Sequence, residues 1–547
     1  MSTVSEHHKL YEEKRAAYSK KVLNSTATKR LVMAGPGTGK SYLFQEVAKD
    51  LLAKGEDKIL VLTFINELVK DLAVDMHGLA EVSTLHSFAA KQLKNKQTIY
   101  PDLLKIAEED FNAEYGKAAH LEKVIYNFQT EETEVINFLS RRRSYYKSYD
   151  PSSIVLELVN LFTQDESKIP QFDLILIDEY QDFNQLEAEL INLLASKNNV
   201  LIAGDDDQSL YSFKHSRPEN IREMYRLDSF ENFELPYCSR STNVVIDAFH
   251  DVVTKAKAEG YLPDRIEKQY LYFPEEKKDK LSEAHPKIEV KTQVFETKNA
   301  FTLDKAICEI FSHEPKFDVL VICSLKKQIK PLATALRKKG YSNISGDEFN
   351  ATDNQRLAEG LGLLALDKDS NLGWRLSARG LMDDKTLNEA IVKSKDCQLA
   401  FSVCLPSEIV SKIKKLRATS IKLEKGQKLK DEDRELLFSS LKIVPSLLAE
   451  NDAREKIFGN NFRGGIHCSV KVKITTILGS KGLSYDYVFM VNFNDKYLIP
   501  REGIEDEYIN KFLVALTRSR KKIFIFTGQN SEPTFVSWID SARKLLN

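Results

Sequence analysis

Ala34-Gly35-Pro36-Gly37-Thr38-Gly39-Lys40-Ser41 is the stretch that decides the fold, because it joins a short apolar run, Arg30–Ala34, to a helical pattern. It follows the phosphate-loop pattern G-x-x-x-x-G-K-[ST], with alanine in the place of the first glycine. Small residues let backbone N–H groups curl around phosphates, and the start of the next helix adds its positive dipole end. The plainer alternative is a glycine-rich turn without a ligand. We predict a nucleotide-binding loop made of Gly35, Pro36, Gly37, Thr38, Gly39, Lys40 and Ser41.

A second apolar run, Asp173–Ile177, ends in two acids, Asp178 and Glu179. Carboxylates at the C-terminal tip of a buried parallel strand lie where ligands bind in such sheets. We predict that Lys40 neutralises phosphate charge, that Asp178 and the Ser41 hydroxyl hold Mg²⁺, and that Glu179 orients and deprotonates the attacking water. The alternative is an acidic helix N-cap, which the helix dipole alone favours. The two motifs in this order predict hydrolysis of a nucleoside triphosphate.

Short β-branched runs alternate with helical stretches along the chain, which is typical of a doubly wound α/β fold. Two stretches interrupt this alternation, because they are helical in period and contain no strong strand. We therefore predict two α/β cores, each with a helical insertion domain. The predicted strands are Arg30–Ala34, Lys58–Thr63, Asp173–Ile177, Val200–Ala203, Ile288–Phe295, Asp318–Cys323, Lys471–Thr476, Tyr487–Val491 and Ile523–Thr527. The predicted domains are a first core (1–93 and 170–233), its insertion (94–169), a second core (234–344 and 466–547) and its insertion (345–465).

The composition excludes several classes of protein. The chain has 547 residues, 42% of them hydrophobic and 29% charged, as in multidomain globular proteins. No apolar run approaches the ~18 residues that a membrane span needs, so no membrane partner is expected. The six cysteines show no zinc spacing, and the N-terminus has no apolar signal core, so a cytoplasmic location is expected. The net charge of −1 neither supports nor opposes binding to nucleic acid.

Seven boxes resemble, in collinear order, those of superfamily 1 DNA helicases of the UvrD/Rep/PcrA type. Asp178-Glu179-Tyr180-Gln181-Asp182 resembles the Asp-Glu-x-Gln-Asp box of that family. The other matching boxes are Thr63–Asn66, Thr84–Phe88, Gly204–Phe213, Ser239–Thr242, Lys481–Leu483 and Ala515–Arg520.

The resemblance implies two RecA-like P-loop NTPase cores with reduced accessory domains, and a cleft that opens and closes during hydrolysis. Gln208 would sense the γ-phosphate, while Arg240 and Arg518 would act as arginine fingers from the second core. Gly482 would also contact the nucleotide. The cofactors implied are ATP and Mg²⁺. The nucleic-acid contacts implied are Phe64, Asn66, His86, Tyr211, Phe213 and Thr476.

This chain departs from the family at the positions that read the base and the sugar. No glutamine precedes Gln45, so the adenine-reading glutamine is missing. Ser239 replaces a tyrosine that stacks on adenine, and Ser484 replaces a glutamate that contacts the ribose. Leu478 replaces a histidine, and Phe213 a tryptophan that stacks on DNA. The residues predicted to be catalytic are nevertheless all present.

The function expected from the resemblance is that of an ATP-dependent translocase or helicase on single-stranded DNA, moving 3′→5′, with a duplex junction as a further partner. An alternative keeps the fold but makes the protein a nucleotide- and DNA-sensing switch in an anti-phage pair that controls a partner nuclease. A repair protein is another expected partner. The run Arg141–Lys147 interleaves basic and aromatic residues, so it is either a single-strand contact or a solvated helix face.

Overall fold

The computed structural model describes residues 2–64, 66–94, 98–210, 215–292, 298–314, 316–339, 341, 344–346, 353–442, 470–528 and 532–546. The chain divides into two compact units. The sheet unit consists of Met1–Phe88, Val159–Glu348 and Gly465–Asn547, and the helical unit of Ala89–Leu158 and Phe349–Gly464. The four-domain division given above, with its boundaries, stays a prediction.

The first sheet of the sheet unit has six parallel strands in the order β3-β2-β6-β7-β1-β8. Its strands are β1 (Lys29–Ala34), β2 (Ile59–Thr63), β3 (Glu81–Thr84), β6 (Leu174–Ile177), β7 (Val200–Gly204) and β8 (Glu231–Leu235). The central strands are buried along their whole length, as expected of parallel strands covered on both faces. Because the strands are parallel, their carboxyl ends lie at one edge of the sheet. At this edge β1 is followed by the glycine-rich loop and β6 by Asp178.

The second sheet has seven parallel strands in the order β13-β14-β12-β15-β16-β11-β17. Its strands are β11 (Ile288–Thr292), β12 (Asp318–Cys323), β13 (Ile344–Gly346), β14 (Lys471–Thr476), β15 (Tyr485–Val491), β16 (Ser519–Thr527) and β17 (Lys544–Leu546). Alternate residues of β12 enter two different apolar clusters, Leu320 one and Val321 the other, because side chains alternate across a strand. Residues 293–295 of the predicted strand Ile288–Phe295 lie outside the described residues. The predicted fold class, two parallel α/β cores with helical insertions, is confirmed.

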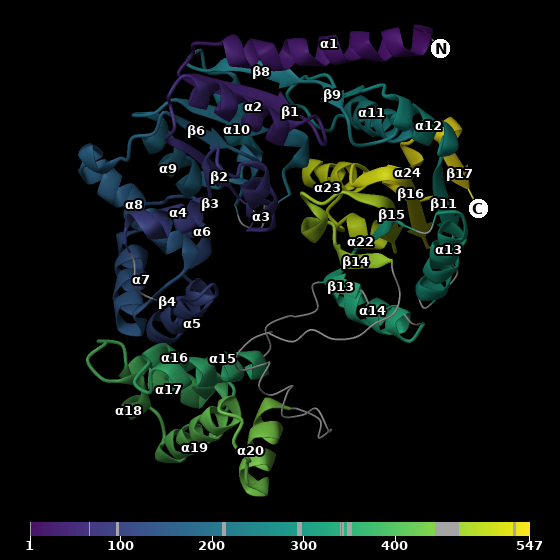
Figure 1. Cartoon of the computed structure of the whole chain (residues 1–547). Coiled ribbons are helices and arrows are strands. Elements are labelled where there is room, and N and C mark those ends of the chain that lie inside the picture. Colours follow the sequence, from purple (N-terminus) through teal and green to yellow (C-terminus); the bar gives the residue numbers. More distant parts are fainter. Residues whose placement is uncertain are drawn as a thin grey trace. The chain divides into compact units, whose positions relative to one another are not determined.

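Helices flank both sheets of this unit, and α1 (Ser2–Asn24) packs against β8, the edge strand of the first sheet (Figure 1). Two of the four boundaries between the units fall within helices, namely α4 (Leu85–Gln92) and α8 (Pro151–Gln164). The α-helices are α1 (Ser2–Asn24), α2 (Lys40–Ala53), α3 (Asn66–Asp75), α4 (Leu85–Gln92), α8 (Pro151–Gln164), α9 (Gln185–Ala195), α10 (Pro218–Tyr225), α11 (Asn243–Ala258), α12 (Glu276–Ala284), α13 (Asn299–His313), α14 (Ile329–Arg337), α22 (Asp495–Leu498), α23 (Asp506–Leu516) and α24 (Thr534–Ser537). Short 3₁₀ turns are η1 (Glu166–Lys168), η2 (Tyr180–Asp182), η3 (Asp206–Gln208), η6 (Lys326–Gln328), η7 (Leu478–Ser480) and η8 (Ser541–Arg543), and the short strands β9 (Tyr237–Cys238) and β10 (Leu271–Tyr272) pair in parallel.

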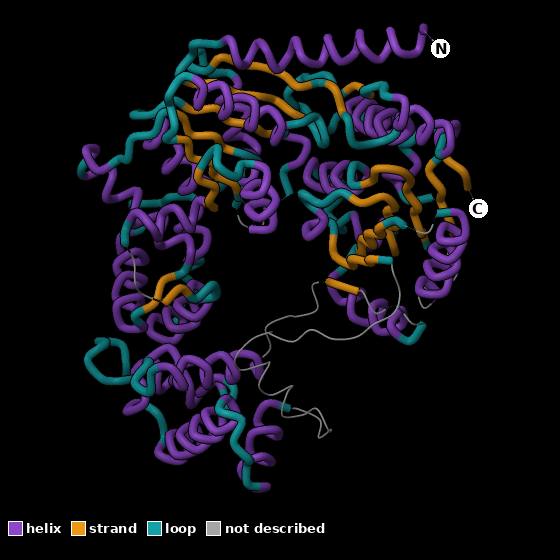
Figure 2. The backbone as a smooth tube through the Cα atoms, viewed as in Figure 1, coloured by secondary structure: helices purple, strands orange, loops and turns teal. Residues whose placement is uncertain are grey.

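The described part of the helical unit consists of helices joined by loops, together with the short strand pair β4 (Thr98–Ile99) and β5 (Ser148–Tyr149), as Figure 2 shows. Its helices are α5 (Leu103–Tyr115), α6 (Leu121–Tyr126), α7 (Thr133–Tyr146), α15 (Asp353–Leu366), α16 (Asn371–Arg379), α17 (Asp384–Lys393), α18 (Phe401–Cys404), α19 (Ser407–Glu424) and α20 (Asp431–Leu441). Both chain segments share one apolar cluster, in which Ile106 of α5 packs with Trp374 of α16 and Ile391 of α17. Among the described residues, no helix combines the length and hydropathy that a membrane span requires.

The basic and aromatic run Arg141–Lys147 is divided between the interior and the surface. Arg142, Arg143, Tyr145 and Tyr146 are buried, so they form neither of the exposed surfaces expected above, whereas Arg141, Ser144 and Lys147 are exposed. Arg142 is 0% exposed and contacts Glu114 and the Ser394 hydroxyl, the latter at 3.1 Å. Tyr146 is 3% exposed, and its hydroxyl donates to Asp110. These side chains join the two chain segments of the helical unit, because Ser394 belongs to the segment opposite to that of Arg142.

Candidate active site

The glycine-rich loop links β1 to α2 and has the backbone conformation that its glycines allow. Gly37 and Gly39 have φ of +72° and +97°, a left-handed region that side-chain-bearing residues rarely adopt. The Thr38 hydroxyl donates to the Gly35 carbonyl at 2.9 Å, which closes the turn. Lys40 is the first residue of α2, so the loop presents its N–H groups and the helix N-terminus toward the same space.

Two acids stand at the tip of β6, next to this loop. The Lys40 ammonium lies 3.1 Å from a Glu179 carboxylate oxygen, and both side chains are about one-tenth exposed. The backbone N–H of Glu179 donates to the Asp178 carboxylate at 3.0 Å. Gln181 holds the other Glu179 oxygen at 2.6 Å. Glu179 has φ +55°, a strained conformation of the kind that gathers at functional sites.

The environment moves the pKa values of the two neighbouring carboxyls in opposite directions. Burial, reinforced by the charge of Glu179, raises the pKa of Asp178 to about 7. Burial also acts to raise the pKa of Glu179, but the nearby charges of Lys40 and Lys481 outweigh it and lower that pKa to about 2. Paired groups with separated pKa values are typical of catalytic sites.

The donor atoms near Asp178 fit a hard divalent cation. Asp178 and Ser41 offer oxygen ligands within one cavity, which is the chemistry that Mg²⁺ prefers. A cation there would also relieve the penalty that burial and Glu179 impose on the charged form of Asp178. The residues present therefore fit the predicted metal.

A cavity of about 350 Å³ brings together residues of both cores. It contains the whole glycine-rich loop, the tip of β6, and residues that follow β7, β9, β14 and α23. The lining residues are Gly35, Pro36, Gly37, Thr38, Gly39, Lys40, Ser41, Leu72, Asp75, Asp178, Glu179, Gln208, Ser239, Arg240, Gly482 and Arg518. Every residue predicted to bind nucleotide or to be catalytic thus lies at this cavity, while the role of each stays a prediction.

The two arginines reach the cavity from the second core. A Cβ atom placed on Gly37 would lie 2.4 Å from the Cβ of Arg240, so the second core contacts the loop directly. Arg518 is 1% exposed, and its Nη2 donates to Gln208 Oε1 at 3.4 Å. Burial, together with the like charge of Arg240, lowers the pKa of Arg518 to about 9, which leaves the guanidinium charged at neutral pH.

Two residues that the sequence did not assign to the site also hold it together. Tyr270 is buried, and its hydroxyl donates to the Pro36 carbonyl at 3.0 Å. The Lys481 ammonium lies 2.6 Å from Asp182 and also contacts the Gln208 carbonyl. Lys481 stands in the Lys-Gly-Leu box, which could have indicated it, whereas nothing around Tyr270 in the sequence gives such a signal.

The residues predicted to contact nucleic acid are only partly described. The Phe64 ring packs edge-on against Phe183 at 5.7 Å, and His86 Nε2 lies 3.2 Å from Glu187. Thr476 ends β14, and its hydroxyl accepts the N–H of Gly479 at 3.2 Å. The side chain of Asn66, together with Tyr211 and Phe213, lies outside the described residues. Contact of these six residues with nucleic acid stays a prediction.

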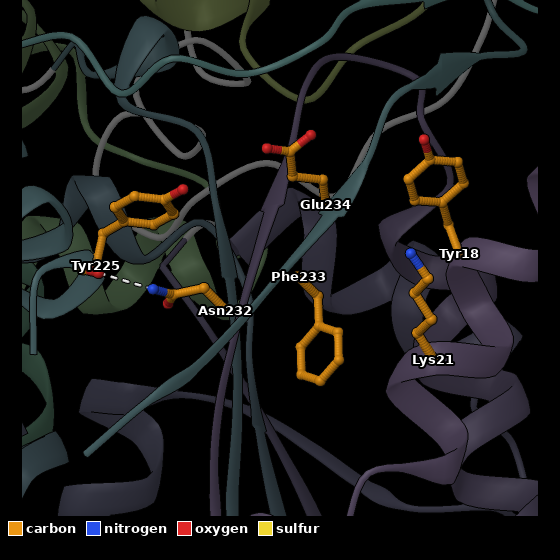
Figure 3. A pocket seen from close by; sticks show the side chains of 6 residues that line it. All are labelled: Tyr18, Lys21, Tyr225, Asn232, Phe233 and Glu234. Carbon is orange, nitrogen blue, oxygen red and sulfur yellow. Dashed lines mark hydrogen bonds between the residues drawn. The ribbon is translucent and has the colours of Figure 1, made fainter. Parts of the chain in front are cut away.

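A smaller hollow of about 280 Å³ lies between α1, α10 and β8 (Figure 3). Phe233 and Glu234 extend from opposite sides of β8, and Asn232 donates to the Tyr225 carbonyl at 2.7 Å. Tyr18 and Lys21 of α1 complete the lining. It contains none of the predicted site residues, so it does not compete with the larger cavity as the candidate active site.

Comparison with known proteins agrees with this geometry. Residues 16–125 and 101–228 match the UvrD/REP helicase N-terminal domain, and residues 393–530 match the UvrD-like helicase C-terminal domain. The ATP-dependent DNA helicase PcrA of Staphylococcus aureus (strain Mu50) is 25% identical over 273 residues, and that of Staphylococcus epidermidis (strain ATCC 12228) is 26% identical over 275 residues. Each alignment covers 41% of this chain and only 37% of the relative's length. Because the N-terminal and C-terminal helicase domains both match in chain order, around a phosphate loop and two arginines at one cavity, the chain belongs to the UvrD/Rep/PcrA-type family of superfamily 1 helicases.

Proposed function

We propose that this chain hydrolyses ATP at the cavity between its two cores and uses the cycle to move along single-stranded DNA in the 3′→5′ direction. The observation that carries the proposal is the cavity itself, which joins Lys40, Glu179 and Gln208 of the first core to Arg240 and Arg518 of the second. Family membership supports ATP as the nucleotide, and single-stranded DNA or a duplex junction as the partner. The direction of movement rests on the resemblance.

The ion pair between Lys40 and Glu179 suggests how the site responds to ATP. In this structure, Lys40 and Glu179 neutralise each other at 3.1 Å. Incoming phosphates compete for the Lys40 ammonium, because a triphosphate carries more negative charge than one carboxylate and attracts the ammonium more strongly. The Glu179 carboxylate then loses its strongest positive neighbour, which raises its pKa toward that of a general base. Mg²⁺ held by Asp178 and Ser41 would offset the remaining phosphate charge.

Arg240 and Arg518 complete the site only where the two cores meet. Both would neutralise charge that develops on the transferred phosphoryl group, as arginine fingers do. Gln208 contacts Arg518, so the predicted γ-phosphate sensor and one finger are already neighbours. Closure of the cavity on ATP and its opening after hydrolysis would drive the movement along the strand.

One experiment tests the proposal and separates it from the alternative function. The ATPase rate of the full chain is measured with and without single-stranded DNA, together with the unwinding of duplexes that carry a 3′ or a 5′ tail. Stimulated hydrolysis with unwinding from the 3′ tail supports the proposal. Stimulated hydrolysis without unwinding of either duplex supports the DNA-sensing switch that controls a nuclease. Absence of hydrolysis under all these conditions contradicts both.

A further inference from the structure

Three consecutive aspartates, Asp205, Asp206 and Asp207, directly follow β7 and are at most 1% exposed. Their carboxylate oxygens lie close enough together to hold a metal ion. The ammonium of Lys268 fills that position instead. It lies 2.6 Å from Asp205 and 3.0 Å from Asp207, and it also contacts Asp206.

Further positive groups balance the remaining charge of this cluster. Arg265 forms two parallel bonds of 2.8 Å to Asp207, the bidentate geometry that suits a guanidinium and a carboxylate. Arg222 donates to Asp206 at 3.2 Å. Three cations thus face three carboxylates in a buried space, and removal of one partner leaves an uncompensated charge.

The cluster joins the two cores, since Lys268 and Arg265 belong to the second one. They lie between α11 and β10, and their neighbours Leu262 and Tyr270 are buried in an apolar cluster of the second core. Leu210, which follows the aspartates in the first core's chain, is buried in the same cluster. Residues 205–210 therefore follow β7 of the first sheet along the chain, but ion pairs with Lys268 and Arg265 and the packing of Leu210 attach them to the second core.

Gln208 depends on this attachment for its position. Its Nε2 donates to Asp205 Oδ2 at 2.8 Å, while the other oxygen of Asp205 is the one that Lys268 contacts. The Oε1 of Gln208 accepts from Arg518. The amide of the predicted γ-phosphate sensor is thus oriented by Asp205, and Asp205 is held by Lys268.

We propose that Lys268, supported by Arg265, is a positioning residue for ATP hydrolysis, because it holds Asp205 and thereby aligns the Gln208 amide with Arg518. The inference rests on the proposed function of this cavity. Lys268 is not among the residues that line the cavity, and its ammonium contacts the three aspartates instead. Its loss should therefore affect turnover rather than nucleotide binding.

The first test compares Lys268→Met with Lys268→Arg and with Lys280→Met, an exposed lysine of α12 that serves as the control. Lys268→Met should lower kcat by about tenfold to a hundredfold, as small misplacements of catalytic groups do, with the Kd for a fluorescent ATP analogue nearly unchanged. Lys268→Arg keeps the charge and should restore most of the turnover. Normal kcat in Lys268→Met, or an equal loss in Lys268→Arg, would overturn the inference.

A double-mutant cycle with Gln208→Ala separates positioning from general stability. If Lys268 acts through Gln208, adding Lys268→Met to Gln208→Ala should cost little further turnover, because coupled residues are not additive. Losses that multiply would show an independent structural role and overturn the inference. Should Lys268→Met fail to fold, Arg265→Met enters the same cycle with the same two outcomes. A wild-type chain without ATPase activity would instead contradict the proposed function.

Discussion

The ammonium of Lys40 and the carboxylate of Glu179 form an ion pair of 3.1 Å at the centre of the candidate active site. Neither group can perform its predicted role while the pair persists, since Lys40 is expected to bind phosphate and Glu179 to accept a proton. Burial by itself acts to lower the pKa of Lys40. The negative charges of Glu179 and Asp178 act in the opposite direction, and the pKa of Lys40 is raised overall. Binding of ATP must therefore replace this contact.

Substitution of either partner should abolish hydrolysis, but with opposite effects on nucleotide affinity. Glu179→Gln removes the base and frees Lys40, so kcat should fall well below a tenth of the wild-type value while ATP binds at least as tightly. Lys40→Ala should lose hydrolysis and also weaken binding, since the phosphates lose their cation. Steady-state kinetics and equilibrium binding measure the two effects. Lys49→Ala, an exposed lysine of the same helix, is the control. Glu179→Gln with more than about a tenth of kcat, ~1.4 kcal/mol, contradicts the base assignment.

Arg240→Ala should lower kcat on the order of 10³-fold with little change in nucleotide affinity, as loss of an arginine finger does. This substitution keeps the Cβ atom that meets Gly37, so it removes the charge without opening the contact between the cores. Arg518→Ala should behave similarly. Single-turnover hydrolysis measures the effect. Arg520→Ala, which loses bonds to Asp318 and Asp486 instead, is the matched control. Near-normal turnover of Arg240→Ala is incompatible with a mechanism that needs both cores.

The choice of nucleobase should be relaxed, because the adenine-reading glutamine and the stacking tyrosine are missing from the sequence. Tyr237, the nearest candidate to replace the ring, is only 8% exposed and packs edge-on with Tyr11, Tyr18 and Phe273. A stacked base contributes about 1–3 kcal/mol and a hydrogen bond about 0.5–1.5 kcal/mol, so their loss should remove most discrimination between ATP and GTP. The measurement is kcat/KM for ATP, GTP, CTP and dATP with saturating single-stranded DNA.

Ser239→Tyr returns a ring to this position and should increase the preference for ATP. A wild-type preference for ATP above about a hundredfold, roughly 2.7 kcal/mol, would show that other residues have rebuilt the adenine site.

Lys278 should make stability depend on alkaline pH. Its side chain is buried, its ammonium donates to the Cys238 carbonyl at 2.9 Å, and burial lowers its pKa to about 8. Below pH 8 the folded chain must hold a charged buried amine. Between pH 8 and about 10.4, the unfolded chain binds this proton and the folded chain does not, so the free energy of unfolding rises with pH in this window.

Lys278→Met should therefore be more stable than the wild type at pH 7, by about 1–3 kcal/mol, and the advantage should shrink by pH 10. Denaturant unfolding of both proteins at the two pH values measures this difference. Lys280→Met controls for the general titration of exposed lysines. An advantage that does not change with pH would argue that packing, rather than charge, is responsible.

The fold and the outline of the candidate site could be predicted because their signals are local. Buried parallel strands are continuous apolar runs, and the groups at their tips follow within a few residues. Asp178 directly follows β6, and Lys40 follows β1 after the glycine-rich loop. Arg240 and Arg518 have no such local signal, and only the order of the family's boxes indicated them.

Contacts between distant segments could not be predicted in this way. Lys268 and Asp206 are separated by 62 residues. Asp206 lies in the Gly204–Phe213 box, but nothing distinguishes Lys268 in a chain of which 29% is charged. The sequence likewise predicts an exposed Arg142, because it shows the basic run but not the residues that pack on it. Its burial depends on Ser394, which belongs to another segment, and a basic run carries no information about such a partner.

Through Gly37 the phosphate loop, which is the predicted nucleotide-binding site, also forms a direct contact between the two cores. Its carbonyl accepts the N–H of Ser239 at 2.9 Å, and its missing side chain leaves the room that Arg240 occupies. A single methyl group at Gly37 would clash with Arg240 and keep the two cores from approaching this closely, even without nucleotide. The shape of the loop is therefore a property of the assembled pair, so a first core produced as an isolated fragment would lack one wall of its own binding site.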